Sequence, residues 1–463
     1  MISKKQKIHL EAPKGLMNDP NGLCWYKGEL YVFFQWNRFS KDHSYKEWGL
    51  FKSSNLLDWD FYGSAIVPDQ EYDNNGVYSG NALEIDGKMH IYYTGNTKPN
   101  GIRKTYQCLA ETDDGELFQK KGIILNTPKD FTEHFRDPFV WKGKDQKYYM
   151  VVGAQKVSGK GAIALCKSCD GKKWNYIGIL AESDNCEMIE CPVVFSLGEQ
   201  QILLFCSQHR DNDKDEVLWS ESLYQLGEWE PQTGDFTVGN LDEKYSRLDW
   251  GMDFYAPQTV CMPDGRTIIF AWMSQMDGEQ TEIFGEGEPN VHCMTLPREL
   301  TLRENRIWQR PARELYQLLD DHIQIPKEKN HFQQETIAEM VSLSERTWYC
   351  KMELLQQEGI FELNINQSEV VFCYDPGEKQ LVFQRKSWIR DGLEQKEVTL
   401  EKLDDLEIWF DTSSIEIFIN GGSVVLSARV IPTQQHTKIR FQKSSKDMIK
   451  SMNMYKMKGR KSN

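Results

Sequence analysis

Three acidic residues lie at matching places in a repeated pattern and could perform nucleophilic and acid–base chemistry. Asp19 lies in MNDPNG, Asp137 in FRDPF and Glu190 in IECPV. A nearby proline fixes its own φ and restricts the residue before it, which can hold a functional side chain in one pose. Asp-Pro is also ordinary turn chemistry, but turn formation gives no reason for three acids to converge. Glycoside hydrolysis is the chemistry that typically needs two carboxyl groups at one bond.

Other catalytic constellations are missing from the sequence. The nine His residues form no HExxH motif, and the single CxxC pair, Cys166 and Cys169, has no second pair with which to bind zinc. There is no Walker loop, dinucleotide fingerprint or GxSxG elbow. We therefore expect neither a metal nor a cofactor.

The elements that would position the acids recur along the chain. A short apolar strand, a turn containing Gly and a second strand occur five times, at 23–35, 82–95, 139–153, 193–208 and 259–274. A second strand–turn–aromatic–Gly pattern interleaves with the first, at 53–63, 111–122, 167–178 and 222–234. Both patterns repeat about every 56 residues, which indicates a repeat architecture. Each unit contains four strands.

This periodicity predicts an all-β protein with two domains. Four-stranded sheets repeated radially form a β-propeller, so five copies predict five blades over residues 1–315. Residues 316–336 are polar and are predicted to be a linker. Strands without the 56-residue step follow at 337–463, and their alternation of apolar and polar residues predicts a β-sandwich.

The propeller places the candidate residues together. Ligands usually bind at the central channel, where the first strand of every blade begins, so the segments just before these strands should converge. These segments are 17–22, 78–81, 135–139, 189–193 and 254–258. We therefore expect Asp19, Asp137 and Glu190 to share one site.

Composition limits the partners. The chain has 463 residues with 55 Lys and Arg against 69 Asp and Glu, a net charge of −14, which argues against a nucleic-acid partner. No apolar run is long enough for a membrane span, and no signal-peptide pattern opens the sequence. The 11 cysteines are scattered, which favours free thiols and a cytoplasmic location. The expected partner is a small sugar molecule.

The segment HLEAPKGLMNDPNGLCWYKGELYVFFQWN resembles the N-terminal signature of the β-fructofuranosidases, which include invertases, sucrose-6-phosphate hydrolases and levanases. The resemblance continues through YSGNALE, FRDPFVW, MIECPVVF, DFYAPQT and TLPREL to DTSSIEIFINGG, and so covers nearly the whole chain. It implies a five-bladed propeller followed by a β-sandwich, as the repeat count predicts separately.

The resemblance also implies roles for individual residues. Asp19 would be the nucleophile, Glu190 the general acid and base, and Asp137 the group that stabilises the transition state. Four positions match residues that line the fructose site, and Arg136 lies beside Asp137; the four are Asn18, Gln35, Trp48 and Ser79. The implied mechanism is double displacement with retention, which requires the two reacting carboxyl groups to lie about 5–5.5 Å apart. Asp19 must stay ionised, and Glu190 needs a raised pKa.

A basic loop suggests the substrate. Residues 38–48 contain Arg38, Lys41, His43 and Lys46 between Gln35 and Trp48. We expect Arg38, Lys41 and Lys46 to be candidates for binding a phosphate on the leaving group, although a solvated loop would have the same composition. The predicted substrate is sucrose or sucrose 6-phosphate. The alternatives are an exo-acting fructanase on levan or inulin and a non-catalytic, sugar-binding propeller.

Overall fold

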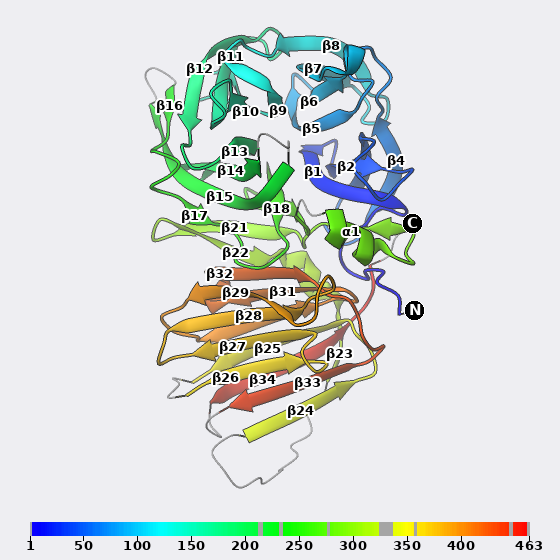
Figure 1. Ribbon diagram of the computed structural model, residues 1–463, viewed down its shortest axis with the longest axis vertical. Helices are drawn as coiled ribbons and strands as arrows, with labels where there is room; N and C mark the ends of the chain where they lie inside the picture. The colour runs from blue at the N-terminus through cyan, green and yellow to red at the C-terminus, as the bar shows by residue number, and fades with distance from the viewer. Residues whose placement is uncertain are drawn as a thin grey trace.

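The computed structural model describes residues 2–211, 216–230, 235–275, 278–323, 337–355, 359–443 and 448–460. The chain is built mainly of β-strands, which confirms the prediction of an all-β protein. Within the described residues the strands form seven sheets. Five lie in the upper, blue-to-green part of Figure 1, and two lie below in yellow to red. We call these the five-sheet region (residues 15–311) and the two-sheet region (residues 319–457).

The five sheets of the five-sheet region follow one another along the chain. The first contains, in spatial order, β20 (Asn290–Val291), β1 (Gly15–Tyr26), β2 (Glu29–Asn37), β3 (Glu47–Ser53) and β4 (Asp60–Ile66). The second contains β5 (Val77–Ile85), β6 (Lys88–Thr97), β7 (Lys104–Thr112) and β8 (Gln119–Asn126). The third contains β9 (Phe131–Lys142), β10 (Tyr148–Lys156), β11 (Gly161–Ser168) and β12 (Asn175–Glu182).

The fourth sheet contains β13 (Met188–Leu197), β14 (Gln200–Asp211), β15 (Glu216–Glu230), β16 (Asp235–Thr237) and β17 (Ser246–Arg247). The fifth contains β18 (Tyr255–Cys261), β19 (Thr267–Trp272), β21 (Arg298–Arg303) and β22 (Arg306–Pro311). The helix α1 (Gly278–Gly285) lies between β19 and β21 along the chain. The short helix η1 (Pro99–Gly101) lies between β6 and β7.

Each sheet is most buried near its first strands. In the second sheet β6 is buried along almost its whole length, whereas the outer strand β8 alternates between exposed and half-buried residues. A strand covered on both faces is an apolar run, and a strand with one wet face alternates. The first strands of neighbouring sheets contact one another in chain order, and β18 in turn contacts β1. The five first strands therefore surround a common centre.

Each first strand is interrupted by a β-bulge at the same place. Against their second strands the register shifts between Met17 and Pro20, between Tyr78 and Gly80, between Glu190 and Val193, and between Tyr255 and Gln258. In β9 the shift lies opposite Val151 and Gly153. Bulges redirect side chains. We expected the candidate residues to precede the first strands, but they lie inside them, at these bulges.

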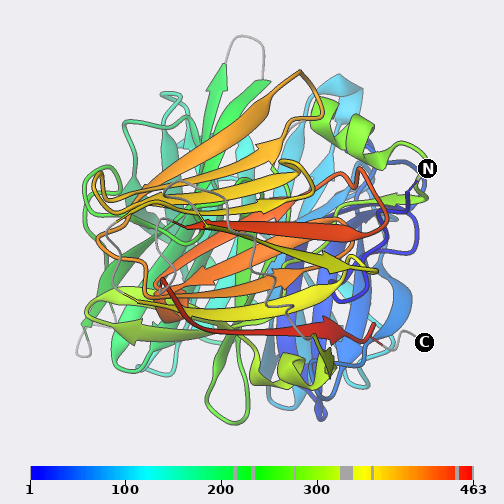
Figure 2. The same cartoon turned by 90° about the horizontal axis from the view of Figure 1, so that it is seen from below.

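The two-sheet region consists of two six-stranded sheets that pack face to face (Figure 2). One contains β23 (Leu319–His322), β34 (Ile449–Met457), β25 (Trp348–Leu354), β30 (Asp405–Phe410), β31 (Ser414–Ile419) and β32 (Val424–Arg429). The other contains β24 (Ile337–Leu343), β33 (Thr437–Lys443), β26 (Phe361–Ile365), β27 (Val370–Asp375), β28 (Gln380–Lys386) and β29 (Leu393–Thr399). The helix η3 (Asn420–Gly422) joins β31 to β32.

The segment between the regions is partly structured. The helix η2 (Arg313–Leu318) leads into β23, which pairs with β34, so the start of the predicted linker belongs to a sheet. Residues 324–336 of that linker lie outside the described residues. One hydrophobic cluster joins Phe34 of the first sheet to Trp409 and Phe418 of the two-sheet region. No helix in the described ranges is long and apolar enough to cross a membrane.

Candidate active site

The three candidate acids lie together in one cavity. The cavity has a volume of about 300 Å³ and is lined by Asp19, Asp137 and Glu190, from the bulges of β1, β9 and β13. The structure therefore places the three acids together, as the repeat predicted. Asp137 itself has φ of 66°, a left-handed conformation that a non-glycine residue rarely adopts. Such strain is typical of sites where the surrounding structure holds a functional side chain in place.

Asp19 is held by two donors. The Ser79 hydroxyl donates to Oδ2 at 2.6 Å, and the Asn18 amide donates to Oδ1 at 2.9 Å. Burial raises the pKa of Asp19, while these two bonds and the charge of Lys46 act in the opposite direction. The residue after Ser79 is Gly80, where an added Cβ would lie 2.0 Å from the Tyr92 carbonyl oxygen. Only glycine allows this close approach, which brings Ser79 to Asp19.

Asp137 contacts the strand that carries Glu190. Its Oδ2 accepts the Cys191 backbone N–H at 3.1 Å, and its own N–H donates to Thr94 Oγ1 at 2.9 Å. Burial raises the pKa of Asp137 to about 7; the positive charge of Arg136 opposes the shift, and the negative charges of Glu190 and Asp19 add to it. This carboxyl group therefore gains its charge as the pH rises through the neutral range.

Glu190 is held on both oxygens. Arg136 donates to Oε1 from Nε at 2.9 Å and from Nη2 at 2.7 Å, and the Tyr255 hydroxyl donates to Oε2 at 2.7 Å. Although burial acts in the opposite direction, Glu190 and Asp137 raise the pKa of Arg136. Arg136 is in turn held by His134, whose Nδ1 lies 3.0 Å from Nη1. The orientation of Glu190, which lies in the fourth sheet, thus depends on Arg136 of the third sheet and Tyr255 of the fifth.

Four of the five predicted substrate-binding residues line the cavity; they are Asn18, Gln35, Ser79 and Arg136. The Gln35 amide donates to the Val77 carbonyl at 2.9 Å. The fifth, Trp48, is fully buried and is not among the described residues that line the cavity. Its indole N–H donates to the Tyr78 carbonyl at 3.1 Å, so it supports the strand that carries Ser79.

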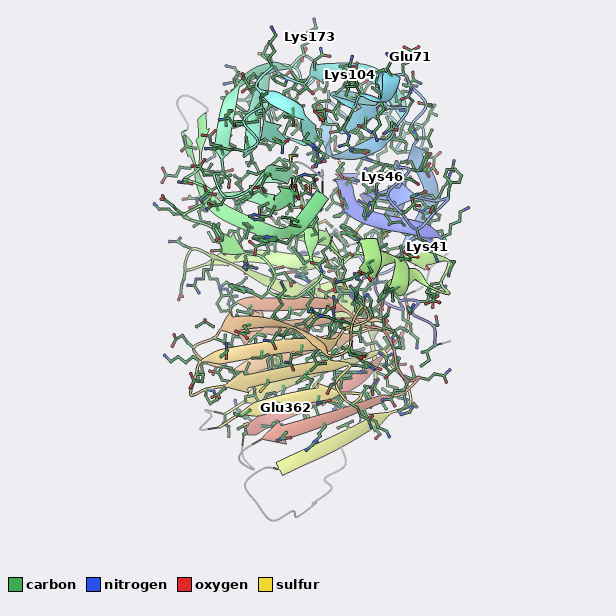
Figure 3. All side chains as sticks on the ribbon, in the orientation of Figure 1. Lys41, Lys46, Glu71, Lys104, Lys173 and Glu362 are labelled. Atoms are coloured by element: carbon green, nitrogen blue, oxygen red, sulfur yellow. The ribbon has the colours of Figure 1, made fainter. Side chains whose placement is uncertain are left out.

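The basic loop is not a single cationic cluster. Arg38 donates to Ser64 at 3.0 Å and lies 3.6 Å from Glu47 Oε1. Lys41 donates to the carbonyl oxygens of Gly285 and Glu288, at 2.6 and 2.9 Å. Of the three lysine and arginine candidates, only Lys46 lines the cavity. Figure 3 shows Lys41 beside α1, well away from Lys46.

Lys46 is a buried part of the site. It donates to Asn18 Oδ1, and its Nζ lies 2.8 Å from His43 Nδ1. Burial lowers the pKa of Lys46 to about 8, and burial together with the charge of Lys46 holds the pKa of His43 well below its usual value. Neutral His43 therefore accepts a hydrogen bond from Lys46. Lys46 also donates to Asn18, which in turn donates to Asp19.

Seven other lining residues are not among those predicted from the sequence; they are Tyr78, Arg103, His134, Gln208, Arg210, Val217 and Tyr255. Tyr255 lies at the bulge of β18, at the same place in its sheet as the three acids. Its segment, 254–258, is one of the five that the repeat predicts to converge. The described residues contain no group of three or more His, Cys, Asp or Glu side chains arranged to hold a metal ion.

Comparison with protein families agrees with this geometry. Residues 9–311 match the model of the glycosyl hydrolases family 32 N-terminal domain, and residues 314–456 match that of the family 32 C terminal. The chain belongs to glycosyl hydrolases family 32. This family 32 chain is therefore a glycoside hydrolase, as the arrangement of carboxyl groups indicates.

Relatives of this family 32 chain share most of its length. A sucrose-6-phosphate hydrolase of Bacillus subtilis is 35% identical over 445 residues, covering 92% of this chain and 89% of its own. A raffinose invertase of Escherichia coli is 33% identical over 441 residues, covering 92% and 89%. The solved structure of a sucrose-6-phosphate hydrolase from Lactobacillus gasseri superposes with a TM-score of 0.84 at 28% identity, covering 98% of this chain and 93% of that one.

Proposed function

We propose that this glycoside hydrolase is a retaining β-fructofuranosidase that acts on sucrose or sucrose 6-phosphate. This proposal is supported by two carboxyl groups that lie in one cavity and have different hydrogen-bond partners. Asp19 is held by small neutral donors, and Glu190 lies between Arg136 and Tyr255. Relatives named for sucrose 6-phosphate and for raffinose support a fructoside substrate.

The proposed reaction has two steps. In the first, an Asp19 oxygen attacks the anomeric carbon of the fructosyl unit while Glu190 gives its proton to the departing glycosidic oxygen. In the second, Glu190 takes a proton from water, whose oxygen attacks the same carbon and releases Asp19. Ionised Asp137 stabilises the positive charge that develops on the sugar. The predicted carboxyl separation of about 5–5.5 Å belongs to this mechanism.

We infer that the five sheets are the blades of a propeller over residues 1–315, with a linker around 316–336 and a β-sandwich over 337–463. The ring of contacts between first strands and the two packed six-stranded sheets support this division. We also infer a cytoplasmic location, which is supported by eleven cysteines that are all free thiols.

Hydrolysis in the presence of methanol tests the proposed function. A retaining fructosidase transfers the fructosyl unit from sucrose to methanol and forms methyl β-D-fructofuranoside, which NMR distinguishes from the α anomer. Formation of the α anomer would exclude double displacement. Preference for inulin or levan oligomers over sucrose and sucrose 6-phosphate would favour the exo-fructanase alternative. No turnover of any of these fructosides would contradict the proposed activity.

A further inference from the structure

Residues at equivalent places in three sheets line the active-site cavity, and we call them the rim. The connection between the second and third strands contributes His43 and Lys46 in the first sheet and Arg103 in the second. The fourth sheet contributes Arg210, near the end of its second strand, β14. The acids lie on the first strands, so a fructosyl unit at the acids leaves the rest of the substrate among these rim residues.

The rim is cationic. The described residues that line the cavity include three acids, which are the catalytic candidates, and one of these, Glu190, is already paired with Arg136. The remaining cations that line it are Lys46, Arg103 and Arg210. Because the protein as a whole carries a net charge of −14, this local reversal of sign favours an anionic leaving group.

The rim cations differ in their contacts. Lys46 donates to Asn18 and contacts His43, and Arg210 donates to Gln208 at 2.9 Å. Both therefore already hold other polar groups of the site.

Arg103 has little to hold it within the protein. Its Nη2 lies 3.4 Å from the Tyr78 hydroxyl, and its guanidinium lies 6.0 Å from the centre of the Tyr78 ring. Its Nε is shielded from solvent and has no hydrogen-bond partner among the described residues. Tyr78 precedes Ser79, whose hydroxyl donates to Asp19. Arg103 therefore contacts the residue next to the one that holds the proposed nucleophile. An arginine guanidinium is planar and can bind the oxygens of a phosphate through paired donors.

We propose that Arg103 binds a phosphate carried by the leaving group, so that the enzyme prefers sucrose 6-phosphate to sucrose. The inference rests on the proposed function and adds to it the residue that distinguishes the two substrates. Arg103 replaces Arg38 and Lys41, whose side chains are held outside the cavity, as the candidate for this contact.

The test is to compare Arg103→Gln with Lys104→Gln. Lys104 is adjacent and exposed, and it is not among the described lining residues, so the control removes the same charge without removing a cavity contact. We expect Arg103→Gln to lower kcat/KM for sucrose 6-phosphate by about 10- to 100-fold, the range for a charge-assisted hydrogen bond. Its kcat/KM for sucrose, and both values for Lys104→Gln, should stay at the wild-type level.

A second measurement follows the inhibition of sucrose turnover, which also shows in the same assay that every variant is folded. Glucose 6-phosphate should inhibit the wild type more strongly than glucose does, and Arg103→Gln should lose that difference. Equal losses on both substrates, or the same selective loss in Lys104→Gln, would overturn the inference. Wild-type turnover of both substrates at equal efficiency would refute the phosphate contact and leave the proposed function standing, whereas turnover of neither would refute the proposed function itself.

Discussion

The hydrogen bonds of Glu190 distinguish its two carboxyl oxygens, which bears on its proposed role as the acid. Oε1 accepts two N–H groups of Arg136, so it has little capacity left to carry a proton. The proton of the acid form therefore belongs on Oε2, beside the Tyr255 hydroxyl. Asp19 has no such cationic fork and accepts from Ser79 and Asn18 instead. The two carboxyl groups thus differ in their surroundings: a guanidinium pairs with Glu190, whereas neutral donors hold Asp19.

Replacing each carboxyl group separately should distinguish these roles. Asp19→Asn and Glu190→Gln should each lower sucrose turnover by at least about 10²- to 10⁴-fold, the usual range for acid–base catalysis alone. A fructoside whose leaving group needs no protonation should partly restore the first step in Glu190→Gln and not in Asp19→Asn. The initial burst of leaving group is the measurement. Equal recovery in both variants would reverse or remove the assignment.

The protonation of Asp137 should set an acid limit to activity. Its pKa is raised to about 7, mainly by burial, so the carboxyl group loses its charge as the pH falls through that value. Because the neutral form stabilises a positive transition state poorly, kcat/KM should decline below about pH 7. Asp137→Asn should keep only a low residual activity. The acid limb of its pH profile should lie at a lower pH, because one of the clustered negative charges has been removed. Wild-type activity that stays level down to pH 5 would contradict this.

The same shift predicts a gain in stability. A carboxyl group whose folded pKa lies above its unfolded value destabilises the folded state at any pH where it must be ionised. Asp137→Asn should therefore melt at or above the wild-type temperature at pH 8, which also shows that its loss of activity is not a loss of fold.

At the scale of elements, bulges in the five first strands and rim residues from three sheets build the site. The bulges carry the acids, Ser79 and Tyr255, and the rim consists of His43, Lys46, Arg103 and Arg210. The connection at residues 38–46 has two different attachments. Lys46 faces inward to Asn18, and Lys41 faces outward to the carbonyl groups at the end of α1.

These attachments predict opposite results for two lysines of one loop. Lys46→Gln should lower kcat/KM for sucrose and sucrose 6-phosphate alike, by about 10- to 100-fold, because Asn18 loses a charged donor and no longer holds Asp19. Lys41→Gln should leave both values unchanged, since its partners are backbone carbonyls outside the cavity. A loss confined to sucrose 6-phosphate in either variant would return the phosphate contact to this loop.

At the scale of the whole molecule, buried ion pairs join the two regions. His9 lies 2.9 Å from both Asp411 and Glu416, and Glu416 also accepts from Arg298 of β21. Burial acts against protonation, but the two carboxylates raise the pKa of His9 above its usual value. In return, and against the effect of burial, His9 helps to lower the pKa of Asp411 to about 2. A charged histidine between two carboxylates therefore ties the N-terminal segment to the two-sheet region.

The pH dependence of stability should show this tie. The contribution of His9 is complete below its unfolded pKa of about 6.5 and is lost as the pH rises through its higher folded pKa. That of Asp411 is present above about 4 and is lost as the pH falls toward about 2. His9→Gln should therefore cost about 3 kcal/mol near pH 5–6, and less at pH 9. Melting curves across pH measure this, with exposed His322→Gln as the control. A constant difference between pH 5 and pH 9 would exclude the charged histidine.

The sequence by itself determined where the site residues lie within each repeat. The recurrence of strand, Gly turn and strand is local, so it can be counted along the chain, and it predicts that Asp19, Asp137 and Glu190 share one centre. It also indicated the all-β fold. It misplaced the start of the first strands because a bulge interrupts the ladder without ending it, and side-chain patterns do not distinguish the two.

Only the tertiary structure decided which groups meet. Tyr255 lies 65 positions from Glu190 in the chain and bonds to it because two sheets meet at the centre. Lys41 and Lys46 are close in sequence yet separate, since backbone carbonyls near α1 bind the first and Asn18 binds the second. Arg103 becomes a candidate for the same reason: its Nε has no partner among the described residues, and its Nη2 makes a single 3.4 Å contact with the Tyr78 hydroxyl. Donor and acceptor pairs of this kind depend on packing between sheets, which a pattern repeated within each sheet does not encode.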